Sequence, residues 1–144
     1  MKDNNNKLEY NTWSGTDYNN NTNNFYADKC NINPSNEYSI IGESSLKITT
    51  NNSASWGFVD LQSLTGISGS CTATLDVYAP KGDILIQIYA GGARSRVTVP
   101  QNKDFQQITL AGTLPSSYEF VVIRCFPRAD NIPYYVDNIS LITG

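Results

Sequence analysis

The stretch "SCTATLDVYAP", residues 70–80, shows the pattern that decides the fold class. Apolar residues alternate with polar residues along it: Cys71, Ala73, Leu75 and Val77 against Thr72, Thr74, Asp76 and Tyr78. Successive side chains of a β-strand point to opposite faces, so a period of two predicts a strand with one row in a core. The end of this stretch and the three residues after it, "APKGD", are typical of a turn.

The same period recurs along the rest of the chain. It marks strands at 45–50, 55–62, 84–90, 95–99, 106–112, 118–126 and 134–142, separated by turn signals such as "AGGA" and "PQNKD". No segment has a sustained helical period. Short strands at this spacing predict an all-β fold, an antiparallel two-sheet β-sandwich of the jelly-roll kind.

The first quarter of the chain differs in composition. Residues 1–36 contain twelve asparagines, and Asn favours turns and left-handed backbone, so loops and short strands are expected there. We expect residues 1–7 to be a disordered or appended tail and residues 8–144 to form a single domain.

Composition excludes several classes of function. Charged residues make up 16% of the chain and the net charge is -3, with no basic cluster, so no nucleic acid is expected as a partner. The chain contains no His, which excludes His-based catalysis and His metal ligands. No stretch is long and apolar enough for insertion into a membrane.

Catalysis by paired carboxylates is not expected either. A glycosidase needs two carboxyl groups facing each other across a cleft. Of the aspartates, only Asp60, Asp76 and Asp137 lie within predicted strands, and none has an evident facing acid. The prediction is therefore that the protein is not an enzyme.

The three cysteines, Cys30, Cys71 and Cys125, allow two interpretations. Cys71 and Cys125 lie in apolar strand patterns, where a buried free thiol acts as a small hydrophobic side chain. The alternative is a disulfide between Cys71 and Cys125 or one that contains Cys30.

The alternation also assigns faces, because each strand has one apolar row for the core. Successive jelly-roll strands tend to alternate between sheets, which places 45–50, 70–79, 106–112 and 134–142 in one sheet and the other four strands in the second. The outward rows of the second sheet are then aromatic and basic, whereas the first sheet shows mostly Thr, Lys, Asp and Gln. The outward residues of the second sheet are Trp56, Phe58, Gln87, Tyr89, Arg96, Phe120, Val122, Arg124 and Phe126. An aromatic and basic face opposite a plain polar face suggests a binding surface.

At this point the sequence resembles a known group of proteins. "GESSLKITT", "SWGFVDL", "TLDVYAP", "QQITLAGT" and the closing "YYVDNISL" run in the order found in carbohydrate-binding modules of the family 4, 9 and 22 type, which are galactose-binding-like jelly rolls. The similarity covers residues 8–142. It implies a non-catalytic module that binds poly- or oligosaccharide.

The resemblance also implies a calcium ion at the edge of the sandwich. The matching ligand positions are Glu9 in "KLEY", Ser44 within the segment 42–45, and Asp137 in the closing strand. Calcium takes oxygen ligands and needs no imidazole. The alternative is that Asp137 and Asn138 hydrogen-bond a neighbouring loop.

Sugars stack their C–H faces on aromatic rings and pair their hydroxyl groups with polar side chains. On the implied binding face the rings would come from Trp56, Phe58, Tyr89 and Phe126, and the donors from Gln87, Arg94, Arg96 and Arg124. The alternative is that Trp56 and Phe58 cap the sandwich beneath a loop of the Asn-rich segment.

The expected partner is therefore a polysaccharide or cell-surface glycan. The expected setting is a monomeric domain of a larger protein, extracellular or at the cell surface. A different class of function stays open: a structural or adhesive domain of a microbial surface protein, adhesin-like, or of a phage tail.

Overall fold

The computed structural model describes residues 26–40, 45–50, 57–116, 120–128 and 132–143, except the side chains of residues 62 and 63. These residues form ten strands and no helix. The strands are β1 (Tyr26–Asp28), β2 (Cys30–Ser35), β3 (Ser45–Thr50), β4 (Phe58–Leu64), β5 (Gly69–Tyr78), β6 (Ile84–Tyr89), β7 (Ala93–Val99), β8 (Gln106–Leu114), β9 (Val121–Pro127) and β10 (Pro133–Thr143).

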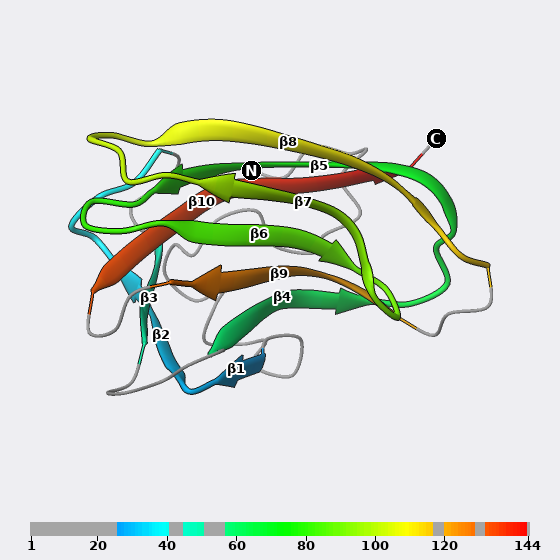
Figure 1. Cartoon of the computed structure of the whole chain (residues 1–144), viewed down its shortest axis with the longest axis horizontal. Coiled ribbons are helices and arrows are strands. Elements are labelled where there is room, and N and C mark those ends of the chain that lie inside the picture. Colours follow the sequence, from blue (N-terminus) through cyan, green and yellow to red (C-terminus); the bar gives the residue numbers. More distant parts are fainter. Residues whose placement is uncertain (1–25, 41–44, 51–56, 117–119, 129–131, 144) are drawn as a thin grey trace.

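The strands form two antiparallel sheets that pack face to face. Sheet A has the order β1-β4-β9-β6-β7, and sheet B has the order β2-β3-β10-β5-β8 (Figure 1). The all-β sandwich predicted from the sequence is confirmed. The assignment of the eight predicted strands to the two sheets is also confirmed, and β1 and β2 add one short strand to each sheet.

The core lies between the sheets and consists of the apolar rows that the alternation predicts. Sheet B contributes residues such as Leu46, Leu75 and Val136, and sheet A contributes residues such as Ile86 and Ile123, all fully buried or nearly so. The opposite row of each strand therefore lies on an outer face of the sandwich.

The edges of the two sheets meet where β7 approaches β8. A Cβ atom built on Gly112 of β8 would lie 3.0 Å from the carbonyl oxygen of Arg94 in β7. A side chain at this position would crowd the β7 backbone, so Gly112 favours the close approach of the two edges.

The polar pair in the middle of β10 forms a β-bulge. Asp137 pairs with Asp76 of β5, but the next pair is Ser140 with Thr74, so β10 has one extra residue. Asn138 is that residue, and its φ of 51° lies in the left-handed region, which Asn tolerates better than most residues. The bulge shifts the alternation by one position, so both Val136 and Ile139 point into the core.

Asp76 and Asp137 directly face each other across β5 and β10, so the expectation that neither has a facing acid was wrong. Like charges in this position repel, and both carboxylates are nearly or fully buried. The surrounding donors compensate. The Asn138 amide donates to Asp76 Oδ2 at 3.0 Å, while the backbone N–H groups of Ile40 and Asn138 donate to Asp137 at 2.7 and 2.9 Å.

The three cysteines are free and buried, as the first interpretation predicted. Cys71 belongs to sheet B and Cys125 to sheet A. Burial raises the pKa of the Cys30 thiol to about 11 and also raises the pKa of Cys125. The thiols therefore act as small hydrophobic groups rather than as nucleophiles.

The outer face of sheet B is not the plain polar surface that the sequence predicted. Tyr135 of β10 lies opposite Tyr78 of β5, and their rings stack with centroids 5.7 Å apart. Tyr38 contacts both rings edge-on at 5.0 Å, and Phe105 contacts Tyr78 at 5.7 Å. The prediction failed because Tyr38 and Phe105 lie outside the strands and because Tyr135 was not placed on the outer row.

Candidate functional site: the outer face of sheet A

The candidate site is a row of side chains that crosses the outer face of sheet A. The strand register places Asp60 of β4 opposite Arg124 of β9, Arg124 opposite Gln87 of β6, and Gln87 opposite Arg96 of β7. Tyr26 of β1 extends the row beyond Asp60. Directly opposed residues in antiparallel strands share a face, so the five side chains form one continuous line.

Arg124 is at the centre of this row and is held on several sides. Its Nε and Nη2 atoms donate to the two carboxylate oxygens of Asp60 at 2.6 and 2.9 Å, in a bidentate ion pair. Its guanidinium carbon lies 4.3 Å from the ring centroid of Phe58 and 3.9 Å from that of Tyr89. The hydrogen bond with Asp60 is the main cause of a raised pKa for Arg124, which is thus a permanent cation.

Aromatic rings surround this cation and continue along the face. The rings of Phe58 and Phe126 are 5.7 Å apart, and those of Tyr26 and Phe58 are 5.8 Å apart. Because the planar guanidinium fills the gap between Phe58 and Tyr89, the rings and the cation together form one platform. We call Tyr26, Phe58, Tyr89, Arg124 and Phe126 the aromatic platform.

Exposure varies across the face. Asp60 is 7% exposed, and Val122, which lies opposite Tyr89, is 1% exposed although it points outward. Phe58, Gln87, Tyr89 and Phe126 are partly exposed, and Arg96 is exposed. Solvent therefore reaches the rings, the Gln87 amide and the Arg96 guanidinium more readily than it reaches the ion pair.

This arrangement can bind a ligand that has both an apolar face and hydroxyl groups. The rings offer stacking surface, and Gln87 and Arg96 offer donors beside it. Arg124 has committed its Nε–H and one Nη2–H to Asp60. Its guanidinium lies against Phe58 and Tyr89, and a bound ligand could use only its remaining N–H groups.

The structure brings six of the eight predicted binding residues together on this face: Phe58, Gln87, Tyr89, Arg96, Arg124 and Phe126. Arg94 lies where the β6–β7 register shifts, and its Nε donates to the carbonyl of Ala90 at 2.8 Å, so it stabilises the hairpin. Trp56 lies outside the described residues. Phe120 precedes β9 and is not part of the strand row in which it was expected.

Two residues of this face were missed from the sequence. Asp60 was considered only as a possible catalytic acid, and its ion pair with Arg124 was not anticipated. Asp60 and Arg124 occupy outward positions of strands that were predicted for the same sheet, and this shared face is the signal that could have paired them. Tyr26 lies in the Asn-rich quarter, where no period is long enough to assign a face.

The calcium prediction rests on Glu9, Ser44 and Asp137, and the first two lie outside the described residues. Both carboxylate oxygens of Asp137 accept a backbone N–H, which matches the alternative of hydrogen bonding to a neighbouring loop. Among the described residues no group of three or more acidic or Cys side chains could hold a metal ion. Calcium needs about six to eight oxygen ligands, so Asp137 alone is insufficient and the ion stays a prediction.

No protein-family model matches the sequence, and no curated protein sequence matches it. No helix among the described residues is long and apolar enough to cross a membrane.

Several solved structures do match the fold. The C-terminal family 22 carbohydrate-binding module of Clostridium thermocellum Xyn10B is 17% identical over 99% of this chain and 96% of that chain, with a TM-score of 0.63. TmCBM61, solved in complex with β-1,4-galactotriose, is 13% identical over 96% of this chain and 99% of that chain, with a TM-score of 0.66. Tailspike protein 4 of bacteriophage CBA120 is 10% identical, with a TM-score of 0.69, and matches 95% of this chain but only 21% of that chain. At these identities the likeness concerns the fold, and the chain has the β-sandwich fold found in carbohydrate-binding modules.

Proposed function

We propose that the protein is a non-catalytic carbohydrate-binding module whose ligand lies on the outer face of sheet A. The observation that carries the proposal is the aromatic platform, with Gln87 and Arg96 beside it in the same row. Stacking on rings combined with side-chain donors is the chemistry that saccharides require. The fold shared with carbohydrate-binding modules supports the proposal.

In the proposed complex, a sugar ring stacks on Tyr89 or on the Phe58–Phe126 pair. The Gln87 amide and the Arg96 guanidinium donate hydrogen bonds to hydroxyl groups at the edge of the ring. Because Phe58 and Tyr89 are held against Arg124, they lose little freedom on binding, which favours affinity. The ligand is a poly- or oligosaccharide, and the module acts outside the cell or at its surface, within a larger protein.

The test is a glycan array followed by calorimetric titration of the best ligand. Tyr89→Ala should weaken binding at least tenfold, since loss of a stacking ring typically costs about 1.5 kcal/mol or more. Gln87→Ala should weaken it by a smaller factor. Gln107→Ala is the matched control, because Gln107 is an exposed glutamine on the outer face of sheet B. If Tyr89→Ala and Gln87→Ala bind as tightly as the parent, the site is not on sheet A.

A second candidate function is a structural or adhesive domain of a microbial surface protein or of a phage tail. The observation that favours it is the likeness in fold to about a fifth of the phage tailspike chain. The encoding gene distinguishes the two candidates. A neighbouring glycoside hydrolase domain favours targeting of a polysaccharide, whereas tandem copies, an anchor or a tail-protein context favour adhesion or structure. A glycan array without any ligand would also favour the second candidate.

A further inference from the structure

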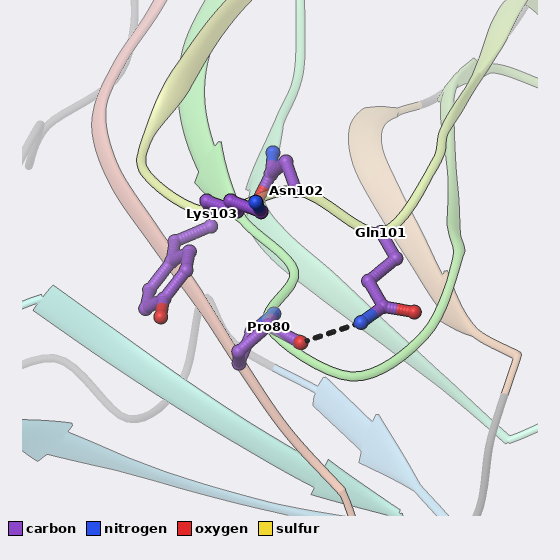
Figure 2. Close-up of a pocket in the computed structure, with 5 residues that line it drawn as sticks. Pro80, Gln101, Asn102 and Lys103 are labelled. Carbon is purple, nitrogen blue, oxygen red and sulfur yellow. Dashed lines mark hydrogen bonds between the residues drawn. The ribbon is translucent and has the colours of Figure 1, made fainter.

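A second candidate site lies at one end of sheet B, beside the end of β5, in an open surface cavity of about 540 Å³. Tyr78 and Pro80 line it from the end of β5, and Gln101, Asn102 and Lys103 line it from the loop between β7 and β8 (Figure 2). Its volume falls within the range of roughly 300–1,000 Å³ that is usual for small-molecule sites.

Hydrogen bonds between the two loops hold the cavity in shape. The Asn102 side chain accepts from the backbone N–H of Ala79 at 2.8 Å and donates to the carbonyl of Val77 at 3.2 Å. The Gln101 amide donates to the carbonyl of Pro80 at 3.0 Å, the bond drawn in Figure 2. A site that is already formed spends less free energy on ordering when a ligand binds.

One wall of the cavity is an aromatic ring held in place by others. Tyr78 is stacked against Tyr135, contacted edge-on by Tyr38, and flanked by Phe105. These neighbours fix the orientation of the Tyr78 ring beside the cavity. A fixed ring beside a pyrrolidine ring, that of Pro80, suits the C–H face of a sugar.

The charge of the lining is positive. Lys103 is the one charged residue among the five that line the cavity, and its side chain is exposed. The nearby carboxylate of Asp83 accepts the backbone N–H of Gln101 and does not line the cavity. The Lys103 ammonium can therefore receive an anionic group, while the Gln101 side-chain oxygen can accept from a hydroxyl.

We propose that this cavity is a second saccharide site that takes an acidic sugar, such as a uronic acid residue. The sugar ring lies against Tyr78 and Pro80, its carboxylate meets Lys103, and a hydroxyl meets Gln101. The site belongs to the other sheet and uses none of the residues of the aromatic platform. Binding here is therefore independent of binding on sheet A.

The experiment is a titration of the ¹⁵N-labelled full chain with sodium D-glucuronate and, separately, with D-glucose at the same ionic strength. The two sugars differ in their carboxylate. Glucuronate should shift the amide resonances of Gln101, Asn102 and Lys103 saturably, in the millimolar range typical of a single sugar with few contacts. Glucose should shift them weakly.

Variants separate the charge of Lys103 from general electrostatics. Lys103→Gln should weaken glucuronate binding about fivefold, which corresponds to the upper range for a solvent-exposed ion pair. Lys103→Arg should retain binding. Lys81→Gln is the matched control, because Lys81 is also exposed and lies in the turn that follows Pro80; it should bind as the parent does.

Three outcomes would overturn the proposal: no saturable shift at these amides, equal binding of glucose, or unchanged binding by Lys103→Gln. Shifts confined to β4, β6 and β9 would overturn it while supporting the sheet A site. Conversely, a glucuronate response at Gln101 and Lys103 that survives Tyr89→Ala would support this second site even if the function proposed for sheet A failed.

Discussion

Replacement of Arg124 is the sharpest test of the geometry on sheet A. The side chains of Arg124 and Asp60 are only 15% and 10% exposed, and two hydrogen bonds join them. Arg124→Met keeps an unbranched side chain of similar length between Phe58 and Tyr89. It also leaves the Asp60 carboxylate without its cation in a place that water barely reaches.

The expected cost follows from that isolated charge. Breaking a buried ion pair by removing one partner costs about 3–5 kcal/mol, and the slight exposure here favours the lower end, about 3 kcal/mol. Removing both charges, as in Asp60→Leu with Arg124→Met, should cost about 1 kcal/mol, because no unpaired charge is left. Arg124→Lys keeps the charge but loses the two-pronged geometry and the stacking, so it should fall between these values.

Urea unfolding followed by circular dichroism measures these differences. For a chain of this length, about 3 kcal/mol corresponds to a melting temperature lower by roughly 6–12 °C. The double-mutant cycle should give a coupling energy above about 2 kcal/mol. A coupling near zero, or an Arg124→Met variant no less stable than the double variant, would refute the account of Arg124 as a largely buried, paired cation.

Three further predictions concern sheet B. Asn138→Gly keeps the left-handed backbone of the bulge but loses the hydrogen bond to Asp76, so the free energy of unfolding should fall by about 1 kcal/mol. Asn138→Ala also strains the backbone and should lower it by about 2 kcal/mol. Equal losses in the two variants would contradict the role of φ. Burial, with the charge of Glu37, raises the pKa of Tyr135 to about 12, against about 10 when unfolded. The contribution of Tyr135 to stability is therefore complete below pH 10 and is lost as the pH rises toward 12. The free energy of unfolding, measured across that range, should fall by about 1–2 kcal/mol. Tyr135→Phe should abolish this pH dependence. If calcium binds at Asp137, adding calcium should raise the melting temperature and a chelator should lower it. Asp137→Ala should remove this response. No shift in the parent protein would contradict calcium binding.

Much of the fold could be predicted because each strand has its own period of two. The alternation in 70–80 identified a core row, and comparable rows marked the other strands. The tendency of successive jelly-roll strands to alternate between sheets then divided eight strands correctly between the two sheets. What the alternation could not supply was which strands are neighbours within a sheet. Asp76 and Asp137 therefore appeared unrelated, although they are direct partners, and Asp60 and Arg124 appeared as separate residues instead of an ion pair.

The aromatic surface of sheet B was missed for a second physical reason. Tyr38 and Phe105 lie in loops, where side-chain direction follows no period, and they join Tyr78 and Tyr135 only after the chain has folded. The bulge at Asn138 adds a further break, because one extra residue changes the phase of β10 halfway along. The polar pair Asp137 and Asn138 in an otherwise apolar strand thus marks a β-bulge.

The two outer faces both present aromatic rings, and their charges distinguish them. On sheet A, the central cation is neutralised by Asp60 and enclosed between two rings, so the middle of that face offers a dispersed, nearly neutral stacking surface. At the end of sheet B, Lys103 is the one charged residue in the lining of an open surface cavity. Stacking energy depends little on salt. Attraction between exposed charges weakens as salt is added, with a screening length of about 10 Å at 0.1 M salt. Binding on the aromatic platform should therefore depend little on salt, whereas binding of an acidic sugar beside Lys103 should weaken as salt is added.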